Sequence, residues 1–187
     1  MNKNGAGSPL NLLRQRMGIV EGACFALRLD PILIQYIGTA KVFLAVTMKG
    51  KFRARITPKV HTELYQEVTQ KLDYLPKCVH MKELDEKWHV EFIEWFDGMN
   101  FQQLRAYGIP PEYYKQFGQF LKDCKKHGIG VGDCTPGNIY HAWDQDITFQ
   151  CDVDMFNRTM KHMPVCIKKL LRGADKEQEK AFHDGYR

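Results

Sequence analysis

One stretch decides how this sequence is interpreted: HGIGVGDCTPGNIYHAWDQDITFQCDVD, at residues 127–154. Within it, Asp133 is followed five residues later by Asn138, with a proline-glycine pair between them. Two short strand-like runs around a charged turn then lead to Asp152, fourteen residues beyond Asn138. This spacing predicts a loop that runs into a β-hairpin, with polar side chains before and after the hairpin.

These three side chains suit phosphoryl transfer, a reaction that depends mainly on positioning and on charge neutralisation. One carboxylate must accept or orient the proton of the attacking hydroxyl group, and Asp133 is the candidate for that role. A side-chain carbonyl and a second carboxylate must hold Mg²⁺, a hard ion that prefers oxygen ligands. Asn138 and Asp152 are the candidates for this metal site. The stretch therefore predicts an ATP-dependent phosphotransferase that uses Mg²⁺.

The same residues resemble the protein-kinase superfamily. The kinase catalytic loop, H-R-D-x-x-x-x-N, is matched by residues 131–138, with its histidine and arginine replaced. The metal-binding D-F-G motif is matched by Asp152-Val153-Asp154, where an aspartate replaces the glycine and Asp154 joins the metal site. The resemblance implies an α+β, two-lobed fold with a small antiparallel-sheet N-lobe and a strongly reduced helical C-lobe.

Two upstream segments continue this resemblance. Residues 37–42, IGTAKV, resemble a shortened glycine-rich loop with one glycine left, and residues 92–104, FIEWFDGMNFQQL, resemble the kinase hinge. The resemblance assigns nucleotide contacts to both segments: Gly38, Thr39, Ala40, Lys41 and Val42 in the loop, and Ile93, Glu94, Trp95 and Phe96 in the hinge, with Ile93 at the gatekeeper position.

The resemblance leaves the residue that contacts the phosphates open. An arginine, Arg55, stands near the place of the usual strand-three lysine, and its planar guanidinium is not equivalent to an ammonium. Lys41 or Lys59 could take over that role, and Lys41 is favoured. The glutamate of the kinase αC helix corresponds to Glu67, or alternatively to Glu63 one turn earlier.

Periodicity and turn residues predict the order helix, β-hairpin, helix, β-hairpin, helices, loop, β-hairpin, helices. The first helix is expected to be short, and alternation in residues 42–47 predicts a strand that leads into a hairpin around Lys49-Gly50. The strongest helix is expected after Pro110-Pro111, with one apolar stripe: Tyr114, Phe117, Phe120, Leu121 and Cys124.

We expect one minimal kinase domain, with about residues 1–96 in the N-lobe, 97–187 in the C-lobe and 1–8 in a mobile arm. Only 35 residues follow Asp152 and no A-P-E motif is present, so the usual activation segment is largely missing.

Composition narrows the possible partners and the compartment. A net charge of +5 with scattered basic residues does not indicate a nucleic-acid surface, and no apolar run is long enough to span a membrane. The six cysteines form no C-x-x-C pair, so we expect reduced thiols in a cytosolic setting. A zinc site at Cys124, His127 and Cys134 lacks a fourth ligand, so zinc is not expected.

The small size, the reduced C-lobe, the polar N-terminus and the segment GTAKVFLA are similar to the HopBF family of bacterial type III secretion effectors. That resemblance implies a serine/threonine kinase, secreted into host cytoplasm and otherwise cytoplasmic, and we expect the chain to be a monomer. Its implied substrate is a host heat-shock chaperone of the ninety-kilodalton class, inactivated by phosphorylation. Two alternatives remain: a small-molecule phosphotransferase of the aminoglycoside or sugar type, and a nucleotide-binding pseudokinase.

Overall fold

The computed structural model describes residues 9–37 and 41–187, so the predicted arm at 1–8 lies outside the described residues. The chain divides into two compact units. The first unit contains the described residues up to Thr62 together with Pro76–Trp95, and the second contains Glu63–Leu75 and Phe96–Arg187. Residues 63–75, which were predicted to belong to the N-lobe, are therefore part of the second unit.

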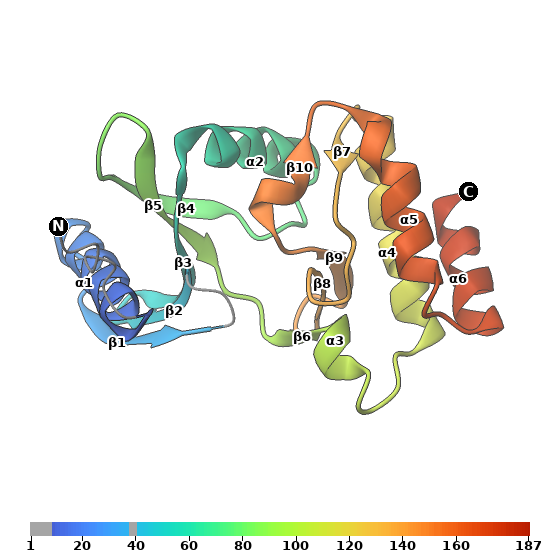
Figure 1. Ribbon diagram of the computed structural model, residues 1–187, viewed down its shortest axis with the longest axis horizontal. Coiled ribbons are helices and arrows are strands. Elements are labelled where there is room, and N and C mark those ends of the chain that lie inside the picture. Colours follow the sequence, from blue (N-terminus) through green and yellow to red (C-terminus); the bar gives the residue numbers. More distant parts are fainter. Residues whose placement is uncertain (1–8, 38–40) are drawn as a thin grey trace, which may run out of the picture. The chain divides into compact units, whose positions relative to one another are not determined.

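The first unit is built on a five-stranded antiparallel sheet with the strand order β1-β2-β3-β5-β4. Its elements are α1 (Pro9–Ala26), β1 (Pro31–Tyr36), β2 (Val42–Thr47), β3 (Gly50–Pro58), the start of α2 (Lys59–Lys71), β4 (Cys78–Glu83) and β5 (Trp88–Glu94), all labelled in Figure 1. The hairpin predicted around Lys49-Gly50 is confirmed, because Thr47 pairs with Gly50 across it. Strand β1 was not predicted, and α1 is longer than the expected short helix.

Alternation in β2 and β3 explains the core of the first unit. Phe43 and Ala45 in β2, and Phe52 and Ala54 in β3, are buried and point to the same face of the sheet. Val20, Ala23 and Cys24 of α1 join them in one apolar cluster, so α1 covers this face. The opposite face carries Arg55 and its cross-strand partners Val42 and Glu91.

The second unit combines helices with short strands. Its elements are the rest of α2, β6 (Gly98–Asn100), α3 (Phe101–Leu104), α4 (Pro111–Lys126), β7 (Gly130–Val131), β8 (Ile139–Ala142), β9 (Ile147–Gln150), the 3₁₀ turn η1 (Val153–Met155), β10 (Phe156–Asn157), the 3₁₀ turn η2 (Met160–His162), α5 (Met163–Leu171) and α6 (Lys176–Tyr186). Strands β6, β8 and β9 form one sheet in that order, and β10 pairs with β7 in another.

Helix α4 is the centre of the second unit. The apolar stripe predicted from its sequence is confirmed, since all five of its members are buried: Tyr114, Phe117, Phe120, Leu121 and Cys124. Helix α6 lies along α4 (Figure 1). Their backbones approach so closely that a Cβ at Gly118 would overlap the carbonyl oxygen of Phe182. A glycine is therefore needed where the two helices meet.

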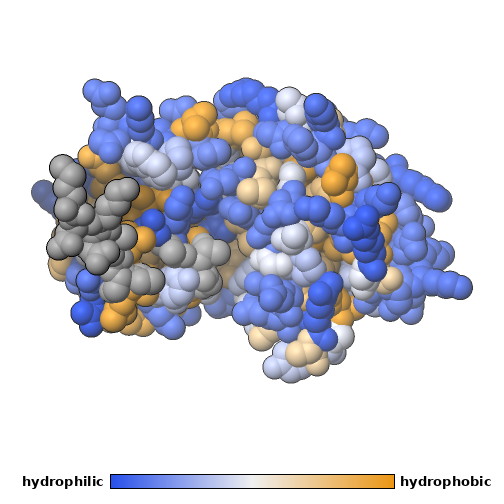
Figure 2. Space-filling view, in the orientation of Figure 1, coloured by the Kyte–Doolittle hydropathy of each residue, from blue (hydrophilic) through white to orange (hydrophobic). Residues whose placement is uncertain are grey.

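The fold is α+β, with the five-stranded antiparallel sheet and six α-helices in the described residues. Among the helices described, none combines the length and the apolar character required to cross a bilayer. On the face drawn in Figure 2, apolar side chains are interspersed with hydrophilic ones.

The expectation of six reduced thiols is wrong for one pair. Cys134 and Cys166 form a disulfide, and their Cα atoms are 4.9 Å apart. The two cysteines are 32 residues apart in the sequence, so only the packing of α5 brings them together. The other four cysteines lie outside disulfides, and burial raises the pKa of Cys24 to about 11 and that of Cys78 to about 12. These two thiols are therefore protonated near neutral pH.

Candidate functional site

The β8–β9 hairpin brings the predicted metal ligands Asn138 and Asp152 near each other. Ile139 pairs with Gln150 at the open end of this hairpin. One residue further out, the backbone N–H of Cys151 donates to the carbonyl oxygen of Asn138 at 2.9 Å. Asp152 is the next residue, so the ladder itself places its backbone beside Asn138. This juxtaposition follows from the strand–turn–strand pattern in the sequence.

Asp133 is joined to Asn138 directly. The Asn138 amide nitrogen donates to the Asp133 backbone oxygen at 3.1 Å and to its Oδ2 at 3.3 Å. Asp133 has a φ of 44°, in the left-handed region that non-glycine residues seldom occupy. Backbone strain of this kind is concentrated at functional sites, where the surrounding structure holds it in place. The loop between the two residues is tight, with the N–H of Thr135 donating to the carbonyl of Asp133 at 2.7 Å.

Gln150 and Met155 hold the Asp133 loop in place. The Gln150 side chain is fully buried, and its Nε2 donates to the carbonyl of Gly132 at 3.0 Å. The N–H of Gly132 in turn donates to the carbonyl of Met155 at 2.8 Å. The sequence interpretation did not assign a role to Gln150. Its position at the end of β9, two residues before Asp152, is the only signal that could have indicated one.

The chain after Asp152 returns to the strand before Asp133. Val131 in β7 pairs with Phe156 in β10. The Phe156 ring lies 5.7 Å from that of Tyr65 in α2 and 6.3 Å from that of Phe120 in α4, measured between ring centroids. This aromatic packing anchors the turn η1, which contains the half-buried Asp154. The β8–β9 ladder therefore precedes Asp152 and Asp154, and the β7–β10 ladder follows them, so the backbone is restricted on both sides of these aspartates.

Lys169 of α5 was not predicted from the sequence and adds a cation to the site. Its Nζ lies 3.3 Å from Asp133 Oδ1, and both side chains are about half exposed, at 52% and 41%. The disulfide links Cys134, the neighbour of Asp133, to Cys166 one turn earlier in the same helix. Lys169 follows Asp133 by 36 residues, and no motif in that interval indicates the contact.

Asn138 and Asp152 carry the oxygen donors that could join a magnesium ion bound to phosphates. Among the described residues, no group of three or more His, Cys, Asp or Glu side chains could hold a metal ion. Mg²⁺ is usually bound by one or two carboxylates together with substrate phosphates and waters. The carboxylate of Asp152 and the amide oxygen of Asn138 are hard donors of this type. Because the Asn138 nitrogen points at Asp133, its oxygen is directed away from that carboxylate.

In the first unit, each of the three candidate phosphate-binding residues has a contact of its own within the unit. The Lys41 ammonium lies over the Trp88 ring, 5.6 Å from its centroid. Lys59 Nζ lies 2.6 Å from Glu83 Oε1. Arg55 is only 6% exposed and lies directly opposite Glu91, which is fully buried, in the β3–β5 ladder.

Glu91 belongs to a buried polar group on this face of the sheet. The hydroxyl of Thr62 in α2 donates to Glu91 Oε2 and lies 2.7 Å from His89 Nε2. Thr62 and His89 are also buried. A buried carboxylate requires compensating polar or charged neighbours, so Arg55 has a structural role in the sheet whatever else it contacts.

The structure describes all but three of the residues that were predicted to contact the nucleotide. Gly38, Thr39 and Ala40 fall outside the described residues, whereas Val42 opens β2, opposite Arg55. Ile93 is buried in β5. Glu94 at the end of β5 accepts a hydrogen bond from the N–H of Lys77 at 2.8 Å. The carbonyl of Phe96 accepts one from the Tyr140 hydroxyl at 3.0 Å.

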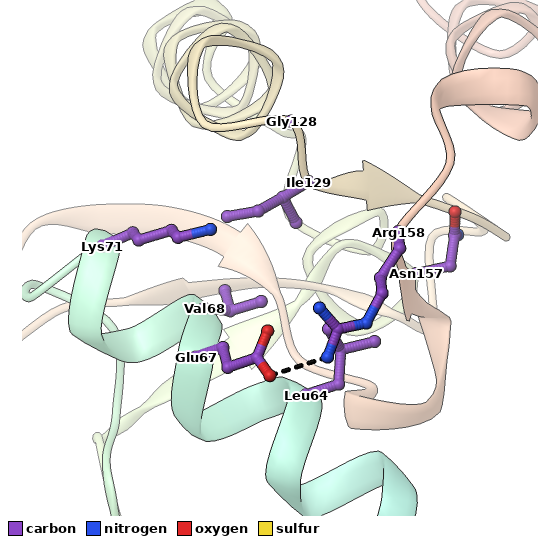
Figure 3. A pocket seen from close by; sticks show the side chains of 8 residues that line it. All are labelled: Leu64, Glu67, Val68, Lys71, Gly128, Ile129, Asn157 and Arg158. Atoms are coloured by element: carbon purple, nitrogen blue, oxygen red, sulfur yellow. Dashed lines mark hydrogen bonds and ion pairs between the residues drawn. The ribbon is translucent and has the colours of Figure 1, made fainter.

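Glu67, the predicted helix-αC glutamate, forms an ion pair within the second unit. Its Oε1 lies 2.7 Å from Arg158 Nη2, across a pocket of about 130 Å³ (Figure 3). The pocket is lined by α2, the α4–β7 connection, the end of β10 and the residue after it: Leu64, Glu67, Val68, Lys71, Gly128, Ile129, Asn157 and Arg158. Drug-sized ligands occupy pockets of about 300–1,000 Å³, so this one is too small for a nucleotide. The alternative, Glu63, is exposed.

Comparison with known proteins does not assign the chain to a family. No protein-family model matches the sequence, and no curated protein gives a significant match. The functional interpretation therefore depends on the sequence motifs and on the geometry of the second unit.

Proposed function

We propose that the chain is an ATP-dependent protein kinase with a minimal two-lobed fold, in which Asp133, Asn138 and Asp152 are the catalytic group. One observation carries the proposal: Asp133 is hydrogen-bonded to Asn138, and the β8–β9 hairpin places Asp152 beside that asparagine. A general base and two metal ligands are the parts that phosphoryl transfer requires. The order of helix, sheet and loop along the chain also agrees with the resemblance.

In the proposed reaction, Asp133 accepts the proton of an acceptor hydroxyl group. The hydroxyl oxygen forms a bond to the γ-phosphorus of ATP, and the bond from that phosphorus to the bridging oxygen of ADP breaks. A positioned base contributes about 10²–10⁴-fold to such a step. The hydrogen bond from Asn138 orients the carboxylate, and the Gln150 contact holds the backbone that carries it.

Asn138 and Asp152 would hold Mg²⁺ together with the phosphates, and Asp154 would join them from η1. When bound, the ion neutralises charge on the phosphates. The contribution of the chain is to keep these oxygens in place before the nucleotide arrives. The two short ladders around η1 serve that purpose, because they restrict the backbone on both sides of the aspartates.

The acceptor is proposed from the resemblance of the sequence to HopBF effectors. We propose a Ser/Thr hydroxyl on a host protein, with a heat-shock chaperone of the ninety-kilodalton class as the first candidate and secretion into host cells as the route. The resemblance points to a chaperone substrate, so we propose recognition by docking on a folded protein rather than by gripping an extended peptide.

A nucleotide-binding pseudokinase is a second candidate, favoured by specific observations in the structure. Glu67 is paired with Arg158, and Arg55 is 6% exposed opposite a buried glutamate. Neither residue has the arrangement expected of a phosphate-binding pair. In that case the chain would bind nucleotide without transferring phosphate.

A Mg²⁺-dependent ATP turnover assay separates these two candidates. Wild-type protein should release ADP, and Asp152→Ala should lose activity by several orders of magnitude while keeping its fold, because positioning and charge neutralisation supply most of the catalysis. Asp144→Ala, in the exposed β8–β9 turn, is the matched control and should remain active. Nucleotide binding without turnover in the wild type would replace the kinase proposal with the pseudokinase.

Labelling with γ-phosphate-labelled ATP tests the acceptor. In a eukaryotic lysate, wild-type protein should label one dominant band of chaperone size, and Asp152→Ala should label none. Labelling of aminoglycosides or sugars, with no protein band, would identify a small-molecule phosphotransferase instead.

A further inference from the structure

The loop that carries Asp133 has no cation of its own. Between Asp133 and Asn138 the residues are Cys-Thr-Pro-Gly, all of them uncharged. The charge is supplied by α5, where Lys169 Nζ lies 3.3 Å from Asp133 Oδ1. The structure shows no carboxylate other than Asp133 paired with this ammonium in the residues it describes.

The Asp133 carboxylate is held at both of its oxygens by different elements. Asn138 donates to Oδ2 from within the loop, and Lys169 approaches Oδ1 from α5. A carboxylate with a donor at each oxygen has a restricted side-chain rotation. Removing one donor releases that rotation, whereas removing an unrelated surface lysine does not.

A covalent link fixes the element that carries Lys169. Cys134, the residue after Asp133, is joined to Cys166 in α5. Lys169 follows Cys166 by three residues, so the two side chains lie on neighbouring positions of one helix face. The same helix buries Met163, Cys166 and Leu170, so the exposed Lys169 is held by a packed support.

We propose that Lys169 is a positioning residue for Asp133, and that the Cys134–Cys166 disulfide is the anchor that holds it there. This inference rests on the proposed kinase function, because it assigns to α5 the orientation of the general base. Its consequence is sensitivity to thiols. Dithiothreitol supplies two electrons and two protons, becomes a cyclic disulfide and leaves Cys134 and Cys166 as two thiols. The loop and α5 then remain in contact only through packing and the ion pair.

Charge and geometry at Lys169 can be separated by substitution. Lys169→Met should lower kcat about 10–100-fold, the cost of a misplaced reacting group, with the KM for ATP changed little. Lys169→Arg should restore most of the rate, because a guanidinium can also donate to the carboxylate. Lys168→Met, at the adjacent exposed position of α5, is the matched control and should behave as wild type. All variants should show unchanged unfolding midpoints, since an exposed ion pair contributes little to stability.

The ion pair and the disulfide can also be detected without an activity assay. Acetylation of Lys169 by an amine-reactive ester, followed by mass spectrometry, should rise in Asp133→Asn and stay constant at Lys168. Alkylation of the denatured, unreduced protein should modify four cysteines and leave Cys134 and Cys166 in one linked peptide pair. Alkylation of all six cysteines would show that the disulfide is absent and would overturn its proposed role.

Cys166→Ser tests the anchor without altering the Asp133 loop. The variant should match the rate of dithiothreitol-treated wild type, should be slower than oxidised wild type, and should not respond to dithiothreitol. Equal rates for the oxidised wild type and Cys166→Ser would overturn the role of the disulfide.

The failures of the two proposals are distinguishable. If wild-type protein forms no ADP, the kinase function fails and the positioning role fails with it. If it turns over ATP and Lys169→Met matches Lys168→Met, the kinase function stands and only the present inference fails.

Discussion

In the second unit the predicted polar residues meet, whereas in the first unit each predicted cation has a local neighbour of its own. Asp133 and Asn138 are hydrogen-bonded, and Asp152 follows directly in the same hairpin ladder. Lys41 lies over Trp88, and Lys59 pairs with Glu83. Arg55 is buried in the sheet opposite Glu91.

The difference reflects how far apart in the sequence the interacting residues are. The second-unit group spans about twenty residues joined by one turn, so local hydrogen bonding is sufficient to assemble it. The contacts of the first unit depend on which face of a strand points inward. One residue of register decides whether an arginine is exposed or buried. The predictions below test this contrast, starting with the largest expected effect and ending with the smallest.

The largest effect is expected at the base. Asp133→Asn removes the proton acceptor but keeps the size of the side chain and its capacity to accept from Asn138. The rate of phosphate transfer should fall about 10²–10⁴-fold. Asp144→Asn in the exposed turn serves as the control and should retain its rate, measured as ADP release under the same conditions. A fully active, folded Asp133→Asn variant would show that the meeting of these residues is structural only.

The next effect concerns the ladder that supports the aspartates. A Cβ at Gly130 would overlap the carbonyl oxygen of Thr159, so Gly130→Ala must displace the chain that follows β10. We expect a loss of about 1–3 kcal/mol in unfolding free energy, the usual cost of overpacking. Urea unfolding measures the change.

Gly22→Ala is the contrasting variant in the first unit. Gly22 lies within α1, and a Cβ built there meets no described atom within 4 Å apart from its chain neighbours and the backbone of its own helix. Alanine should therefore stabilise the helix by about 0.5–1 kcal/mol. If Gly130→Ala were equally well tolerated, the close packing of β7 against the chain after β10 would be incorrect.

Arg55 tests the interpretation of the first unit. Arg55→Ala removes a buried cation opposite Glu91, so the polar groups around it lose a neighbour that they cannot replace with water. The expected loss is about 1–3 kcal/mol in unfolding free energy, the cost of leaving a buried polar group unsatisfied. Lys59→Ala removes an exposed ion pair and should change stability by less than about 1 kcal/mol. An Arg55→Ala variant of full stability but reduced ATP affinity would instead restore Arg55 as the phosphate-binding residue.

The smallest effect is a pH dependence at His141 in β8. Burial lowers the pKa of this histidine, with Asp146 acting in the opposite direction, and its ring stacks on Tyr113 at 3.5 Å between centroids. A lowered pKa in the folded state means that the unfolded chain binds the proton more tightly. Stability is therefore complete above the ordinary histidine pKa of about 6.5 and is lost as the pH falls below it.

Urea unfolding at pH 7.5 and pH 5.5 measures this dependence. The difference in unfolding free energy between the two pH values should be smaller in His141→Gln than in wild type. An unchanged difference would mean that His141 does not contribute to the acid sensitivity.

Sequence patterns predicted the elements whose signals are local. The alternation in residues 42–47 predicted β2, and the helical stripe of Tyr114 to Cys124 predicted α4, because burial of one face selects both periods. The short strand β1 was missed, since Pro31–Tyr36 pairs along the edge of a sheet and lacks a clear pattern of burial. The arrangement of Asp133, Asn138 and Asp152 was predictable because a single hairpin connects them.

The sequence by itself determined the α+β class, the order of the main elements and the three residues of the proposed catalytic group. Each depends on contacts between residues that are near each other along the chain. Only the tertiary structure decided that Arg158 pairs with Glu67, that Cys134 is linked to Cys166, and that Lys169 lies at Asp133. These pairs are separated by 91, 32 and 36 residues, and a sequence contains no local signal for such contacts. They arise when α5 and the chain after β10 pack against the rest of the second unit, which depends on the whole apolar core.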